Sequence, residues 1–177
     1  MIEDFKDRVF ILEGPDCSGK TTLAKKLSDT YNIEYGHLTY YEDKDAMEKQ
    51  FADVLANENF RREGCVVDRF ILSNIVYGIV FQDFNFVSGW KYYLDSLCRN
   101  WIKGKEIIMC LPYNKEKYLK NFELSTKRRR EKYTDIEKMG KVYDLFEIFY
   151  EILTHNADIK LTRYDYIKEM EGRYHAE

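Results

Sequence analysis

One segment of this sequence carries every residue type needed to bind a phosphate chain. Residues 14–21 are Gly-Pro-Asp-Cys-Ser-Gly-Lys-Thr, which fits the pattern G-x-x-x-x-G-K-[ST] at each position. Glycines at both ends let the backbone bend tightly and approach phosphate oxygens, and Lys20 adds a cation for the β- and γ-phosphates. The hydroxyl of Thr21 is a suitable ligand for Mg²⁺. We therefore predict a site for ATP and Mg²⁺ built from Gly14, Cys17, Ser18, Gly19, Lys20, Thr21 and Thr22.

Two charged residues, Asp68 and Arg69, follow a short apolar run at residues 65–67. Arg69 can grip a phosphate with two parallel hydrogen bonds, which a lysine cannot do. Asp68 either orients Arg69 or, together with Thr21, holds the metal ion and its water. A purely structural ion pair at a strand end is the alternative. Both residues are candidates for catalysis, as is Lys20.

Strands alternating with helices must position these residues. The apolar run 9–12 predicts a buried strand before the loop, and residues 23–31 predict the first helix after it. Because unpaired N–H groups and the positive end of the helix dipole lie at a helix N-terminus, that helix should begin at the phosphates. Ser73 is the expected N-cap of a helix that runs to about Phe81. Further strands are expected at 33–39, 65–68, 105–111 and 158–162, and further helices at 46–62, 90–102, 115–122, 136–153 and 166–174.

This alternation predicts an α/β fold with three layers, in which a five-stranded parallel sheet has helices on both faces. Ligands of such sheets lie at the carboxyl ends of the strands, where the phosphate loop and Asp68-Arg69 would meet. The 177 residues are 45% hydrophobic and 33% charged and contain no Gly/Ser linker, so we expect a single domain over 1–177. A net charge of -3 gives no reason to expect a nucleic-acid partner.

The cysteines and the termini indicate the compartment. Cys17, Cys65, Cys98 and Cys110 show no C-x-x-C pairing, which favours a reducing environment over a disulfide framework. The start of the chain is charged, and no apolar run is long enough to span a bilayer. We expect a cytoplasmic protein without a membrane partner.

Three segments resemble thymidylate kinases. Residues 13–22 are similar to the opening loop of that family, and residues 68–77, DRFILSNIVY, resemble its D-R-[aromatic or His]-x-x-S-x-x-x-Y segment. Arg129-Arg130-Glu131 is similar to the R-x-E at the edge of the family's lid, which would here span about 123–135. The overall texture is closest to the short members found in large bacteriophages, for which the compartment would be the host cytoplasm.

The resemblance implies a P-loop kinase that transfers a phosphoryl group from ATP to a (deoxy)nucleoside monophosphate, most simply dTMP or a related pyrimidine nucleotide. Arg69 would grip the acceptor phosphate, and Asp16 would reach the sugar hydroxyl. Phe70, Ser73 and Tyr77 would line the acceptor pocket. Some members carry a catalytic arginine inside the phosphate loop, where this chain has Cys17. The charge should therefore come from the lid, from Arg128, Arg129 or Arg130, with Glu131 favouring Arg129.

Such an arginine is worth about 10³–10⁵ in rate when it reaches the transferring group. The alternative for the basic run is a solvated helix face. The family's usual polar residue that contacts the base is replaced by Gly78, and its characteristic segments after the second and fourth strands are absent. The base of the acceptor is therefore open.

Other functions share parts of this pattern. A nucleoside kinase would use a carboxylate base such as Glu42, Asp43 or Asp45 to activate a neutral hydroxyl. A nucleotide-binding regulator or ATPase would hydrolyse ATP without an acceptor, and phosphorylation of polynucleotide 5′ ends would need a basic, aromatic stripe. Arg69 suits an anionic acceptor best. Apolar helix faces around 75–81 and 90–101 are compatible with a homodimer.

Overall fold

The structure is a computed structural model that describes residues 8–38, 64–81, 105–129, 135–155 and 159–174. The expected helices at 46–62 and 90–102 lie outside these ranges. The strands are β1 (Val9–Glu13), β2 (Glu34–His37), β3 (Cys65–Asp68), β4 (Glu106–Cys110) and β5 (Lys160–Tyr164). The described helices are α1 (Lys20–Tyr31), α4 (Ile71–Phe81), α6 (Lys115–Arg129), α7 (Ile136–Thr154) and α8 (Tyr166–Tyr174).

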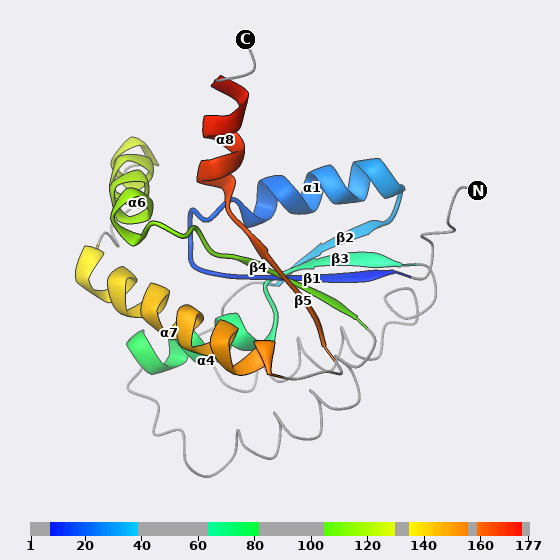
Figure 1. Ribbon diagram of the computed structural model, residues 1–177, viewed down its shortest axis with the longest axis horizontal. Helices are drawn as coiled ribbons and strands as arrows, with labels where there is room; N and C mark the ends of the chain where they lie inside the picture. Colours follow the sequence, from blue (N-terminus) through cyan, green and yellow to red (C-terminus); the bar gives the residue numbers. More distant parts are fainter. Residues whose placement is uncertain (1–7, 39–63, 82–104, 130–134, 156–158, 175–177) are drawn as a thin grey trace.

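The strands form one parallel sheet in the order β2-β3-β1-β4-β5, with β1 at the centre. This confirms the predicted five-stranded α/β fold. Helices cover both faces of the sheet, with α1 and α8 above it and α4 and α7 below it in Figure 1. Each of the five strands is followed by a helix or by a segment that the structure does not describe.

The central strand β1 is buried on both faces, and its alternate residues pack in opposite directions. Phe10 and Leu12 join a cluster with Leu23 and Ala24 of α1. Val9 and Ile11 point to the other side. There a second cluster joins α4 and α7, with Val76, Val142 and Phe146 at its centre. Because both faces of β1 pack against helices, residues 9–12 are apolar without interruption.

Two helix boundaries near the site differ from the sequence predictions. Helix α4 begins at Ile71, so Ser73 lies inside its first turn and is not its N-cap. Helix α6 continues to Arg129, well past 122, and the charged pair Glu123–Lys127, four residues apart, supports the added turns. The first half of the predicted lid is therefore helix. In the part of the chain that the structure describes, no helix is both long and apolar enough to cross a membrane.

Candidate functional site

The phosphate loop connects β1 to α1, and its backbone is contorted at three positions. Gly14 has φ 142°, and a Cβ atom there would lie 2.2 Å from the carbonyl oxygen of Cys110 on β4. Gly19, the N-cap of α1, has φ 85°, and the non-glycine Cys17 has φ 58°. Residues with side chains rarely adopt these values, so the loop requires glycine at its two ends.

Lys20 turns its side chain back into this loop. Its Nζ donates to the carbonyl oxygens of Gly14 (2.7 Å) and Pro15 (2.6 Å), and the residue is 5% exposed. Burial lowers the pKa of Lys20 below its ordinary value, while the nearby carboxylate of Asp16 opposes that shift. The N-cap of α1 has no side-chain hydrogen bond, so the first amide groups of the helix are not capped by a side chain.

Asp68, at the end of β3, lies beside the start of α1. The Thr21 hydroxyl donates to Asp68 Oδ2 (2.7 Å), and Tyr35 OH (3.3 Å) and His37 Nδ1 (3.1 Å) approach the same oxygen. Asp68 Oδ1 is buried and has no hydrogen-bond partner among the described residues. Hydroxyl and carboxylate oxygens are hard ligands. Thr21 and Asp68 therefore fit a Mg²⁺ site in which phosphates supply other ligands. No cage of three or more acidic, histidine or cysteine side chains occurs in the described ranges.

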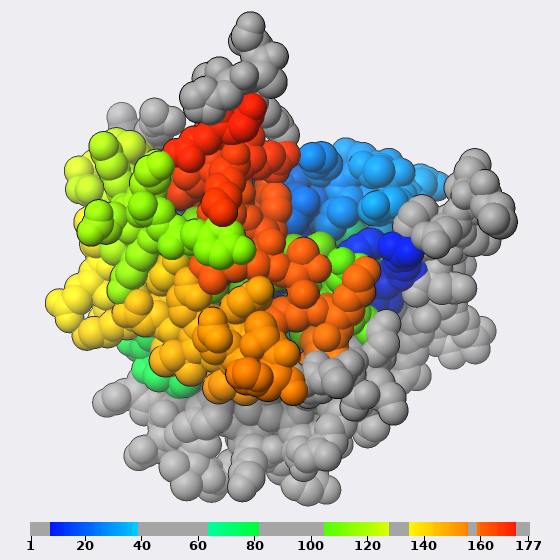
Figure 2. All heavy atoms as spheres, in the orientation of Figure 1, coloured from blue at the N-terminus to red at the C-terminus, as the bar shows by residue number. Residues whose placement is uncertain are grey.

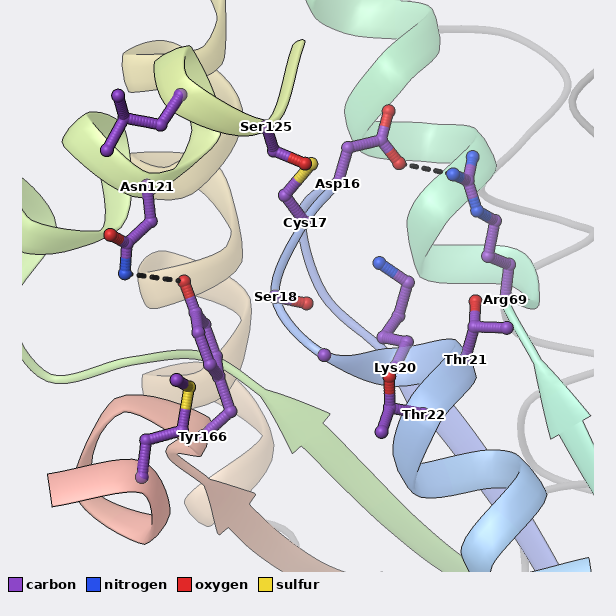
Figure 3. A pocket seen from close by; sticks show the side chains of 13 residues that line it. Asp16, Cys17, Ser18, Lys20, Thr21, Thr22, Arg69, Asn121, Ser125 and Tyr166 are labelled. Carbon is purple, nitrogen blue, oxygen red and sulfur yellow. Dashed lines mark hydrogen bonds and ion pairs between the residues drawn. The ribbon is translucent and has the colours of Figure 1, made fainter. Parts of the chain in front are cut away.

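The predicted acceptor residues Asp16 and Arg69 form an ion pair beside the phosphate loop (Figure 3). Arg69 Nη2 donates to Asp16 Oδ1, and the guanidinium lies 5.7 Å from the centre of the Tyr77 ring. Burial is the largest single influence and opposes the charge of Arg69, but the acidic groups around it, Asp16 foremost, together outweigh burial, so the pKa of Arg69 is raised. Arg69 has φ 70°, and its amide donates to the Leu12 carbonyl at 2.9 Å. The turn therefore aims the guanidinium at the phosphate loop.

The three residues predicted to line an acceptor pocket are buried. Phe70 belongs to the core, and Tyr77 OH accepts a hydrogen bond from the Asp16 amide (2.8 Å). Ser73 donates its hydroxyl to Glu13. None of the three lines the cavity described below, and their contact with an acceptor stays a prediction.

Sequence reasoning missed Glu13, the last residue of β1. It is 1% exposed, and its carboxylate accepts hydrogen bonds from the amides of Leu72 (2.9 Å) and Ser73 (3.0 Å). These amides belong to the first turn of α4, so Glu13 caps that helix from another element. Burial raises the pKa of Glu13 to about 7. An acidic residue at the end of an otherwise apolar strand was the signal that could have identified it.

A cavity of about 590 Å³ opens in front of the loop. Figure 3 shows its two sides, with the loop and Arg69 on one side and Asn121 and Tyr166 on the other. Asn121 of α6 donates to the Tyr166 hydroxyl of α8 at 3.2 Å. Figure 2 shows these two helices next to each other at the surface. The lining residues are Asp16, Cys17, Ser18, Gly19, Lys20, Thr21, Thr22 and Arg69, with Asn121, Leu124, Ser125, Tyr166 and Met170 from α6 and α8.

The α6 and α8 wall was not predicted from the sequence. Leu124 and Met170 are apolar residues that are 47% and 51% exposed, which is high for side chains of this type in a cavity wall. Tyr166 adds an aromatic ring. A wall of this kind suits the flat face of a nucleobase.

The predicted lid arginines fall at the edge of the described chain. Arg128 and Arg129 are the last residues of α6, and Arg130 lies outside the described ranges. The candidate bases Glu42, Asp43 and Asp45 of the nucleoside-kinase alternative also lie outside them. These assignments stay predictions.

Comparison with known proteins identifies the fold. The structure resembles the YorR protein of Bacillus subtilis, solved in complex with phosphorylated GDP, with a TM-score of 0.61 and 21% identity over 89% of this chain and 85% of that chain. It also resembles deoxyadenosine kinase from M. mycoides with dCTP bound, with a TM-score of 0.56 and 16% identity over 96% of this chain and 100% of that one. The chain has the P-loop kinase fold.

A structure of the same deoxyadenosine kinase with the products dCMP and dCDP gives a TM-score of 0.55 and 15% identity over 95% and 98% of the two chains. In sequence, the chain is 38% identical over 84 residues to the SPbeta prophage-derived uncharacterized protein YorR of Bacillus subtilis (strain 168). That match covers 45% of this chain and 48% of YorR, about half of each. No protein-family model matches the sequence.

Proposed function

We propose that this protein is an ATP-dependent nucleoside monophosphate kinase. The observation that carries the proposal is the Asp16–Arg69 pair, which lines the same cavity as Lys20 and Thr21. A guanidinium held beside a phosphate loop suits an acceptor that is itself an anion. The fold shared with deoxyadenosine kinase supports phosphoryl transfer to a nucleoside or nucleotide in general.

The donor triphosphate would lie along residues 14–21, with its β- and γ-phosphates at the amides of the loop and at Lys20. Its nucleoside would rest against the α6 and α8 wall, where Leu124, Tyr166 and Met170 offer apolar and aromatic surface. Thr21 and Asp68 would hold Mg²⁺, which when bound neutralises charge on the phosphates. Lys20, already directed into the loop by the carbonyls of Gly14 and Pro15, needs little reorganisation to contact the triphosphate.

In the reaction, an acceptor phosphate oxygen forms a bond to the γ-phosphorus while the bond from that phosphorus to the β,γ-bridging oxygen breaks. ADP leaves, and the acceptor becomes a diphosphate. Asp16 engages Nη2 of Arg69, and Nε of the same guanidinium is buried without a partner among the described residues. Because Arg69 lines the cavity, the N–H groups of this planar fork that Asp16 does not engage would hold the acceptor phosphate in line with the donor. An arginine of the 128–130 run would complete the charge neutralisation.

The finer assignments belong to the same proposal. The resemblance of residues 68–77 to thymidylate kinases favours dTMP or a related pyrimidine nucleotide as acceptor, in a cytoplasmic protein whose partners are small nucleotides. A nucleoside acceptor is the second candidate, because deoxyadenosine kinase shares the fold over nearly its whole length.

ADP release with ATP and Mg²⁺ would be measured for a panel of nucleoside monophosphates and the matching nucleosides. We expect turnover with one or two monophosphates and little without an acceptor. Turnover with nucleosides alone would move the acceptor chemistry to a carboxylate base. Equal turnover without any acceptor would replace the proposal with an ATPase.

A further inference from the structure

The peptide groups of Asp16 are held from two sides by buried tyrosines. Tyr77 of α4 accepts a hydrogen bond from the Asp16 amide at 2.8 Å. Tyr118 of α6 donates its hydroxyl to the Asp16 carbonyl oxygen at 2.9 Å. The side chain of the same residue pairs with Arg69. Any movement of the Asp16 backbone therefore moves the partner of the acceptor arginine.

Tyr118 is rigidly placed. It is 0% exposed, and its ring packs against Tyr143 of α7 with centroids 5.4 Å apart and against Phe122 with centroids 6.4 Å apart. Burial keeps the pKa of Tyr118 well above its ordinary value, so its hydroxyl remains a proton donor at any pH at which the protein works. With the ring fixed, the hydroxyl links the position of α6 directly to the phosphate loop.

The same helix forms part of the opposite wall of the cavity. Asn121, Leu124 and Ser125 follow Tyr118 by one to two turns and line the cavity. A ligand that packs on this wall therefore contacts the helix that holds Asp16. By contrast, Tyr77 reaches Asp16 from α4, none of whose residues lines the cavity.

We propose that Tyr118 is a positioning residue that couples the donor wall on α6 to the acceptor pair Asp16–Arg69. The proposal rests on the proposed function, because it takes Arg69 as the acceptor clamp. Donor binding that fixes α6 also fixes the Asp16 carbonyl, and with it the orientation of the carboxylate that holds Arg69. The acceptor then binds an Arg69 guanidinium that is already oriented for it.

The test compares Tyr118→Phe with the matched variant Tyr143→Phe. Both changes remove one hydroxyl from the same cluster, but Tyr143 OH contacts the Pro112 carbonyl and Glu147, not the loop. Calorimetric titration would give the Kd of the monophosphate selected by the turnover panel, alone and with saturating AMP-PNP and Mg²⁺. For the wild type and Tyr143→Phe we expect AMP-PNP to tighten acceptor binding about fivefold or more.

In Tyr118→Phe we expect that tightening to fall below about twofold, with the Kd of AMP-PNP itself changed by less than about twofold. Unchanged coupling in Tyr118→Phe would overturn this inference while leaving the kinase proposal intact. Equal loss in both variants would assign Tyr118 to packing alone, and an uncoupled wild type would also overturn it. A wild type that binds AMP-PNP but no monophosphate would overturn both proposals. If Tyr118→Phe does not fold, the test is the Nε–Hε NMR resonance of Arg69 in the wild type. We expect this resonance to shift when AMP-PNP is added. A constant resonance would contradict the coupling.

Discussion

Replacing Glu13 by glutamine should change how the stability of this protein depends on pH. The Glu13 carboxyl is buried at the end of β1, and its pKa is raised from 4.5 to about 7. Between these two values the folded state binds a proton more readily than the unfolded state. The contribution of Glu13 to the free energy of unfolding is therefore greatest below about pH 4.5 and is lost as the pH rises through 7.

The size of the effect follows from the shift. At 1.36 kcal/mol for each pKa unit, a rise from 4.5 to about 7 removes about 3 kcal/mol of stability between pH 4.5 and pH 8. Glutamine does not titrate, so this contribution disappears. Its amide nitrogen cannot accept a hydrogen bond from Leu72, Ser73 or the Ser73 hydroxyl, and an unpaired group costs about 1–3 kcal/mol at every pH.

Urea unfolding followed by circular dichroism at several pH values from 4.5 to 8 would measure this. We expect Glu13→Gln to be about 1–3 kcal/mol less stable than the wild type at pH 4.5. Between pH 4.5 and pH 8 the difference should move by about 3 kcal/mol in favour of the variant, so that it vanishes or reverses. Glu106→Gln is the matched control, because Glu106 begins the adjacent strand and pairs with Lys160 away from the loop. A constant difference between Glu13→Gln and wild type across this range would refute the reasoning.

The remaining predictions concern the site itself. Lys20→Ala should lower turnover by at least about 100-fold, because a fixed cation next to the transferred phosphoryl group is lost. ADP release measures this turnover, and a normal rate would show that Lys20 has no part in the mechanism. Arg69→Ala should weaken acceptor binding by at least about 30-fold (about 2 kcal/mol) and ATP binding little; equal losses in two calorimetric titrations would make Arg69 structural. Gly14→Ala should lower the free energy of unfolding by more than about 1 kcal/mol, because the new Cβ meets the Cys110 carbonyl; urea unfolding checks it, and a wild-type midpoint would contradict the loop geometry.

Local patterns in the sequence predicted the strand, glycine loop and helix of the candidate phosphate site, because these elements are contiguous from Val9 to Tyr31. The meeting of Asp68 with Thr21 followed from the rule that parallel strands present their carboxyl ends at one edge. The start of α4 was misplaced because its first amides are satisfied by Glu13, whose carboxylate comes from a distant strand. A capping rule that considers only neighbouring residues in the sequence cannot identify a cap that comes from a distant strand.

The α6 and α8 wall could not be predicted for a related reason. Asn121 and Tyr166 come together only when β5 pairs with β4 and carries α8 to the side of α6. Half-exposed residues such as Leu124 and Met170 follow no periodicity that distinguishes a cavity wall from ordinary surface. Tyr118 was likewise indistinguishable from the other tyrosines, because only its hydroxyl partner, the Asp16 carbonyl, reveals its role.

The central place of β1 has a consequence for how the chain folds as it is synthesised. Of the five described strands, β1 leaves the ribosome first, yet its two neighbours are β3 and β4, which follow much later in the sequence. Until β4 emerges, the apolar segment Val9–Leu12 lacks one edge partner, and Gly14 lacks the Cys110 carbonyl against which it packs. Nascent chains from which β4 has not yet emerged therefore expose an apolar strand and an unformed loop, which makes them candidates for chaperone capture.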